Sequence, residues 1–101
     1  MLKKTDSKAL EFIIENEATI RNEEEFYNLF NSQINNSDNF LIKLKNIKNI
    51  DLSFIQLLLS IRKTLNNLNK ELTFEIEIIP ASLKILNNAG INPETLLKVG
   101  N

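Results

Sequence analysis

The chain has 101 residues, of which 43% are hydrophobic and 25% charged, and its 12 basic and 13 acidic residues give a net charge of −1. This length and composition predict one globular domain that spans residues 1–101. Cysteine and histidine are absent, which excludes disulfides, thiolate nucleophiles and sulfur-ligated metals and leaves no side chain that titrates near neutral pH. We therefore expect a protein that is not an enzyme, without catalytic residues, cofactor or metal.

The distribution of charge and apolar residues also limits the partners. No block of Lys or Arg is long enough to follow a phosphate backbone, so we expect no binding to nucleic acid. No apolar run approaches the roughly 18 to 20 residues of a membrane-spanning helix, and the first residues lack the apolar core of a signal peptide. The sequence predicts a cytoplasmic protein without direct membrane insertion.

Two strands are expected before the first helix. Within residues 10–15, Leu10, Phe12 and Ile14 alternate with Glu11, Ile13 and Glu15, which predicts a strand with one buried face. Asn16 and Glu17 predict a turn, and residues 18–20 a short second strand.

The first helix is expected to begin at Asn22. Asn22 and Glu25 have the spacing of a capping box, in which each side chain bonds a backbone amide of the other residue. The helix should end in the polar residues 35–39, and its apolar stripe consists of Phe26, Leu29, Phe30 and Ile34.

Residues 40–45 and 72–79 predict two further amphipathic strands. If these strands are neighbours, their charged residues share the face away from the helices, where opposite charges contribute about 0.2 to 1 kcal/mol a pair. Glu75 and Glu77 are also spaced like a catalytic pair of carboxylates. A charged sheet face matched by Lys43 and Lys45 explains them better.

Three more helices follow from the pattern. Residues 52–68 carry an apolar stripe, Pro80 can open a helix that ends at Gly90, and Asn92 can cap a short last helix that begins at Pro93. In this last helix the residues expected to close over the core are Leu96, Leu97 and Val99.

Strands and helices alternate along most of the chain, which is the pattern of an α/β fold. We expect a four-stranded mixed sheet with helices packed mainly on one face. One strand of this expected sheet consists of residues 18–20.

The junction between the strand at 40–45 and the helix at 52–68 carries an acid and a hydroxyl, Asp51 and Ser53. A hydroxyl at a helix N-terminus is well placed for phosphorylation, because free amides and the helix dipole favour a phosphate. An alternative is structural. Ser53 and Gln56 match the S-x-x-Q capping box, which is worth about 1 kcal/mol.

These residues, with the strand before them and residues 80–91, resemble a STAS domain, the family of anti-sigma factor antagonists and of the cytoplasmic tails of sulfate transporters. The antagonists' motif is an aspartate, a small residue, a phosphorylated serine or threonine, a glycine and an aliphatic residue. Asp51, Ser53 and Ile55 match it, whereas Leu52 and Phe54 replace the small residue and the glycine. The resemblance implies a STAS-like fold and phosphorylation at Ser53.

The resemblance also implies a non-enzymatic regulatory binding module in a bacterial partner-switching signal transduction pathway. The module would bind a kinase-type anti-sigma factor or signalling protein, and phosphate at Ser53 would release it. The partner-binding residues would be Asp51, Leu52, Ser53, Phe54 and Gln56.

Three alternatives remain from the sequence. The chain would be a small STAS subunit of a membrane lipid-transport ABC complex, which docks on the ATPase while Ser53 only caps a helix. Leu52 would be either an apolar anchor for the partner or a core residue. An enzyme that uses Asp51, Glu75 or Glu77 is least favoured, because the sequence shows no activated nucleophile and no metal-ligand spacing.

Overall fold

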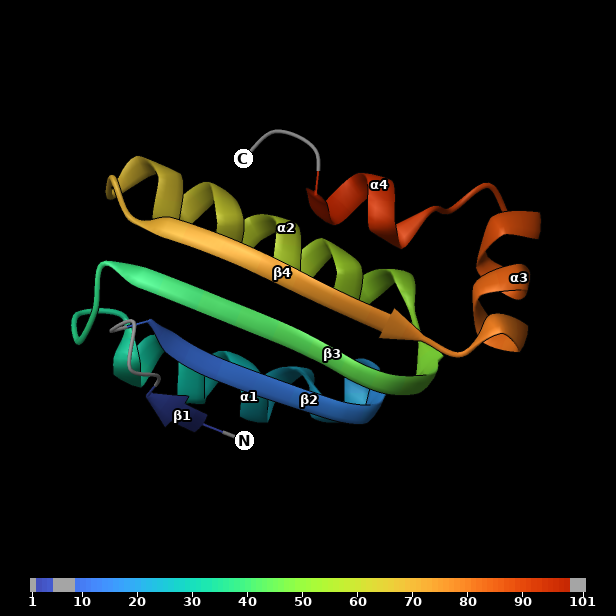
Figure 1. The fold of residues 1–101 in the computed structure, drawn as a ribbon, viewed down its shortest axis with the longest axis horizontal. Coiled ribbons are helices and arrows are strands. Elements are labelled where there is room, and N and C mark those ends of the chain that lie inside the picture. The colour runs from blue at the N-terminus through green and yellow to red at the C-terminus, as the bar shows by residue number, and fades with distance from the viewer. Residues whose placement is uncertain (1, 5–8, 99–101) are drawn as a thin grey trace.

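Two consecutive strand–helix–strand units form the body of the molecule (Figure 1). The computed structural model describes residues 2–4 and 9–98. In chain order the elements are β1 (Leu2–Lys4), β2 (Leu10–Ala18), α1 (Ile20–Gln33), β3 (Asn39–Ile50), α2 (Leu52–Asn67), β4 (Glu71–Ile78), α3 (Pro80–Asn88) and α4 (Pro93–Lys98).

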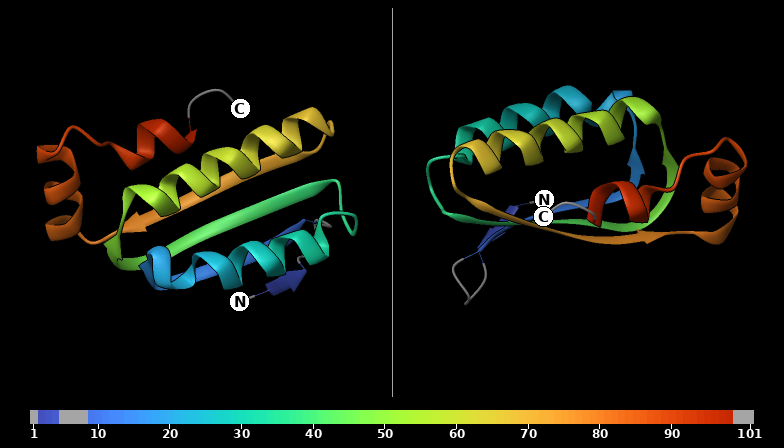
Figure 2. Two further views of the ribbon diagram at one scale, coloured as in Figure 1. Left: turned by 180° about the vertical axis from the view of Figure 1, so that it is seen from behind. Right: turned by 90° about the horizontal axis from the view of Figure 1, so that it is seen from above.

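The long strands β2, β3 and β4 lie side by side in this order, and both pairings are parallel. Parallel neighbours need a crossover connection, which α1 and α2 provide. Both helices lie on the same face of the sheet (Figure 2). The short β1 runs antiparallel along the outer edge of β2, where Lys3 is the register partner of Glu11.

The four-stranded mixed sheet expected from the sequence, with one strand at residues 18–20, is wrong: the body of the sheet is β2, β3 and β4, which are all parallel, and the described residues add only the three-residue β1 at the edge. Residues 18–20 form no strand of their own: Ala18 ends β2 and Ile20 begins α1. Asn16 does not turn the chain back. Its φ of 68° lies within β2, where the register to β3 shifts. Asparagine tolerates this left-handed conformation, so it makes a bulge and the strand continues.

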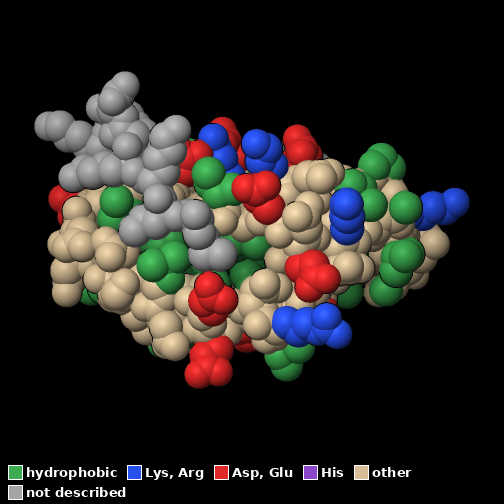
Figure 3. All heavy atoms as spheres, turned by 90° about the horizontal axis from the view of Figure 1, so that it is seen from below, with side chains coloured by type: hydrophobic (Ala, Val, Ile, Leu, Met, Phe, Trp, Pro, Cys, Tyr) green, Lys and Arg blue, Asp and Glu red, His purple; other side chains and the backbone are tan. Residues whose placement is uncertain are grey.

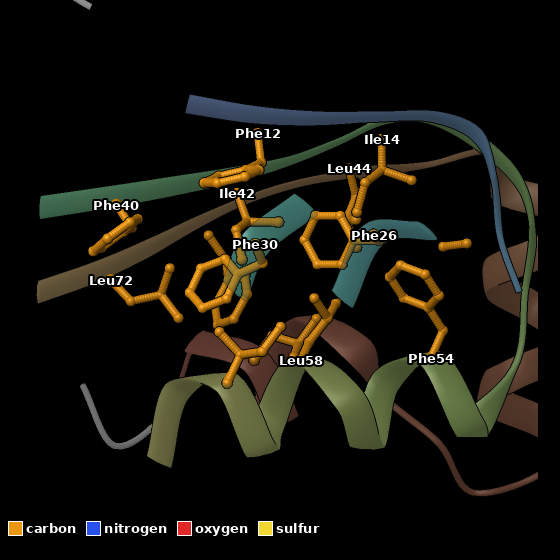
Figure 4. Packing of buried hydrophobic residues seen from close by; sticks show 14 of the residues in the cluster. Phe12, Ile14, Phe26, Phe30, Phe40, Ile42, Leu44, Phe54, Leu58 and Leu72 are labelled. Carbon is orange, nitrogen blue, oxygen red and sulfur yellow. The ribbon is translucent and has the colours of Figure 1, made fainter. Parts of the chain in front are cut away.

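Phenylalanine side chains fill the space between the sheet and the two helices (Figure 4). Ring centroids lie 5.4 Å apart for Phe12 and Phe30 and 5.7 Å apart for Phe26 and Phe54, within the range of favourable aromatic packing. Complete burial of one such side chain stabilises the fold by roughly 1.5 to 3 kcal/mol. The stripe predicted for the first helix is confirmed, since its two phenylalanines are buried and its two aliphatic residues pack against the core.

The helices agree with the sequence except at the start of α1. This helix begins at Ile20, and the residue before it, Thr19, makes no capping bond with its side chain. The other predicted ends are confirmed: α3 begins at Pro80 and is followed by Gly90 with a φ of 80°, and at the start of α4 Asn92 Oδ1 accepts a hydrogen bond of 3.2 Å from the Thr95 amide. Leu97 is buried, whereas Leu96 is 40% exposed. Val99 lies outside the described residues.

The face of the sheet opposite α1 and α2 carries an ion-pair cluster. Lys43 Nζ lies 2.6 Å from Glu11 Oε1 and 3.5 Å from Glu75 Oε2. The expected pairing of Lys43 with Glu75 is therefore confirmed, while Glu77 accepts a hydrogen bond of 3.0 Å from the Asn46 amide. Acidic and basic side chains are also interspersed on the surface seen from below (Figure 3).

The bond to Glu11 raises the pKa of Lys43 above its ordinary value of 10.5, with smaller contributions from the charges of both glutamates and against the effect of burial. The protonated form is thus favoured in the folded state. The resulting stabilisation is fully present below pH 10.5 and is lost as the pH rises through the folded pKa.

The free energy of unfolding should fall as the pH rises from about 9 to about 12. We predict that this fall is smaller in Lys43→Arg than in the wild type, because a guanidinium stays charged over this range. Urea denaturation at each pH measures the loss. Lys45→Arg on the exposed part of the same strand is the control and should behave like the wild type. Equal losses in all three proteins would show that the Lys43 cluster does not govern alkaline stability.

Candidate functional site

Asp51 caps two helices at once. Its Oδ1 accepts a hydrogen bond of 2.9 Å from the Phe54 amide in the first turn of α2, and its Oδ2 accepts one of 2.9 Å from the Ile20 amide at the start of α1. The two oxygens of this carboxylate therefore accept from one backbone amide that lies 31 residues from Asp51 in the sequence and from another that lies three residues from it. A negative charge at both helix N-termini is also favoured by the helix dipoles.

The parallel sheet explains why the two helix starts meet. The C-terminal ends of β2 and β3 lie at the same edge of the sheet, with Ala18 and Ile50 in register. The Asp51 amide donates a hydrogen bond of 3.2 Å to the Ala18 carbonyl, which holds the residue after β3 against the end of β2. Because a helix follows each strand at this edge, their first turns are neighbours.

The same geometry corrects the predicted start of α1. The capping box of Asn22 and Glu25 does not form; Asn22 Oδ1 instead accepts a hydrogen bond of 3.3 Å from the Thr19 hydroxyl. The helix begins two residues earlier because Asp51 reaches it from the neighbouring unit. No local sequence pattern contains this information.

Ser53 lies in the first turn of α2 and is partly buried. Its hydroxyl donates a hydrogen bond of 2.8 Å to Glu23 Oε2 on α1. The alternative in which Ser53 caps α2 is wrong, because Asp51 occupies the capping position. The serine instead joins the first turns of the two helices.

The remaining predicted partner-binding residues divide between core and surface. Phe54 is 0% exposed and packs on Phe26, so the structure removes it from the surface. Leu52 is 46% exposed, which contradicts its alternative placement in the core. Gln56 is exposed one turn further along α2. Side chains of α2 that are adjacent in sequence therefore lie in different environments.

Residues that the sequence analysis did not select extend the exposed apolar area. Ile20 is 68% exposed and Tyr27 is 45% exposed, and both lie on one face of α1 with two glutamates between them. A hollow of about 450 Å³ opens here between the helices, lined by Ile20, Glu23, Glu24, Tyr27 and Leu57. The i, i+3, i+4, i+7 spacing of the four α1 residues was readable in the sequence once the helix start was known.

We call this region the α1–α2 surface: it comprises the residues that line the hollow together with Leu52, Ser53 and Gln56. Its centre is apolar, and Glu23 and Glu24 add negative charge. None of the described residues that line the hollow is positively charged. The arrangement suits a contact with an apolar and basic surface.

Comparisons of the chain with protein-family models, with curated proteins and with solved structures found no match. Among the described helices none is both long enough and apolar enough to cross a membrane. The described part of the chain also contains no group of three or more Asp and Glu side chains placed to hold a metal ion.

We predict that Asp51→Ala lowers the free energy of unfolding by about 2 kcal/mol, since it removes a helix cap and a second charged hydrogen bond. Asp51→Asn should cost about half as much, because an amide keeps one accepting oxygen and turns a donor toward the other helix. Chemical denaturation measures both values.

The control is Asp38→Ala, which removes a carboxylate that is 91% exposed and pairs with Lys70 at 3.4 Å. Such a surface pair is worth about 0 to 1 kcal/mol. If Asp51→Asn were as stable as the wild type, one cap alone would suffice and the double role of Asp51 would be disproved.

Proposed function

We propose that the chain is a non-enzymatic, cytoplasmic protein-binding module that docks through the α1–α2 surface on a kinase-type anti-sigma factor or related signalling protein, under control of phosphorylation at Ser53. The observation that carries the proposal is the bond of 2.8 Å between Ser53 and Glu23. It puts the hydroxyl that matches the antagonists' phosphorylated position at the joint between the two helices that form the exposed apolar surface.

The α1–α2 surface supports a protein partner by its chemistry. Ile20, Tyr27 and Leu52 each expose two fifths or more of their area, although large apolar residues are otherwise mostly in the core. Ile20 and Tyr27 line the same hollow, and exposed apolar side chains rimmed by charge are typical of protein interaction sites. The negative rim favours a partner with basic residues around an apolar contact.

Phosphorylation would change this surface by charge. A phosphate adds about −1.5 to −2 charges. At Ser53 it would replace the hydroxyl that donates to Glu23, and it would stand close to a second carboxylate, Asp51. The dipole of α2 at its N-terminus favours the phosphate, whereas the two carboxylates repel it. The expected result is that the first turn of α1 moves away from α2 and the hollow changes shape.

A second candidate is a permanent subunit of a membrane lipid-transport ABC complex, docked on its ATPase through the same surface. One observation favours it: the Ser53 hydroxyl is partly buried and already bonded. In this case Ser53 only holds the two helices together. Phosphate would then be absent from the protein in its own cells.

The test begins with the tagged chain isolated from its own cells, whose co-purifying proteins and Ser53 peptide are identified by mass spectrometry. We predict that Ser53→Asp weakens binding to the purified partner about tenfold or more, equivalent to about 1.4 kcal/mol, because it adds charge beside Glu23. Asn28→Asp, which adds a charge at an exposed α1 position outside the hollow, should bind like the wild type.

Equal binding by Ser53→Asp and the wild type would contradict the phosphorylation switch. A transporter ATPase that co-purifies with a chain never phosphorylated at Ser53 would support the second candidate. Thermal unfolding of each variant checks that a loss of binding is not a loss of fold.

A further inference from the structure

We call the face of the sheet opposite α1 and α2 the open face. The sign of the charged side chains on this face alternates from strand to strand. On this face β2 carries Glu11 and Glu15, and β3 carries Lys43 and Lys45. On the same face β4 carries Glu71, Glu75 and Glu77, each of them exposed, and Glu75 is the register partner of Lys43.

At the other edge β1 runs antiparallel to β2, with Lys3 in register with Glu11. Each acidic strand thus has a basic strand beside it. The acidic strand β4 is the last strand of the sheet, and no basic strand lies on its outer side among the described residues.

The backbone of β4 is able to pair with a further strand. The Glu71 amide donates a hydrogen bond of 2.8 Å to the Asp38 carbonyl just before β3, so the amide of Glu71 points toward β3. Because backbone groups alternate along a strand, those of Leu72 and Phe74 point toward the outer edge. Within residues 2–4 and 9–98, no strand pairs with this edge.

Space is available at the beginning of β4. A hollow of about 300 Å³ borders the edge there, lined by Asn66, Lys70, Glu71, Leu72 and Thr73. The helix α4 packs against α2 and β4. It lies beside the end of β4 that leads into α3, and the Glu71 end is free of it (Figure 1). An added strand would therefore pair with the first half of β4.

We infer that the outer edge of β4 binds an extended segment of another protein in which Lys or Arg alternate with apolar residues. The segment adds a strand beside residues 71–75. Its basic side chains meet Glu71 and Glu75 on the open face, and backbone hydrogen bonds to Leu72 and Phe74 provide affinity. This site is independent of the α1–α2 surface and of the proposed function.

A second copy of β4 is a poor occupant of the same edge. Antiparallel pairing of two β4 strands about a twofold axis would set glutamates of one copy against glutamates of the other, and like charges directly opposite each other are destabilising. The acidic row thus excludes the strand itself and selects a basic one, as charged residues on edge strands commonly do.

The probe for this site is an eight-residue peptide of alternating valine and lysine with blocked termini, added to the ¹⁵N-labelled full chain. We predict that the amide resonances of Leu72 and Phe74 shift most. The same peptide with N-methyl groups on alternate residues should bind about tenfold more weakly, because it keeps the charge and loses the strand hydrogen bonds. Glu71→Lys should weaken binding about fivefold or more.

The matched control is Glu25→Lys, an equal change of charge at an exposed position of α1 outside both hollows, which should bind like the wild type. Equal binding of the methylated peptide, or shifts spread over the charged face without a maximum in β4, would reduce the effect to nonspecific charge attraction and overturn the inference. Concentration-dependent shifts of β4 without peptide would overturn it as well, by assigning the edge to a second copy of the chain.

Discussion

One carboxylate holds the two halves of this protein in register. Parallel strands place the helices that follow them at one edge of the sheet, where the first amides of each helix lack partners within the helix. Asp51 satisfies one such amide in α1 and one in α2. It also donates its own amide to the end of β2. The position of α1 against α2, the depth of the hollow between them and the reach of Ser53 to Glu23 all depend on this residue.

The first turn of α2 combines three environments in consecutive residues. Leu52 is exposed, Ser53 bonds to α1, and Phe54 packs in the aromatic core. The STAS resemblance would place a glycine at position 54, where this chain has Phe54. Its side chain packs in the core and fixes the start of α2, whereas a glycine would leave room for another molecule beside the Ser53 backbone. The Phe54 ring is therefore held in the core against Phe26 and is not part of the surface of the turn.

Patterns within one element were readable from the sequence, and contacts between elements were not. The stripe of α2, Pro80 at the start of α3 and the cap at Asn92 each depend on residues a few positions apart. The start of α1 depends on Asp51, 31 residues away. Asn16 has the local signature of a turn, yet pairing along β3 keeps the strand extended on both sides of it. The local pattern around Ile20 likewise predicts a strand, because the contact with Asp51 that starts the helix is not local. Ile20 is therefore not recognisable from the sequence as one end of the α1–α2 surface.

Tyr27 gives the α1–α2 surface an optical reporter. The chain has one tyrosine and no tryptophan, so its intrinsic ultraviolet emission comes from a single ring that lines the hollow beside two glutamates. That ring is 45% exposed. A partner that covers the hollow changes the solvent around the only strong fluorophore, whereas a strand bound at β4 leaves it untouched. Occupation of the two surfaces is therefore distinguishable in the unlabelled protein.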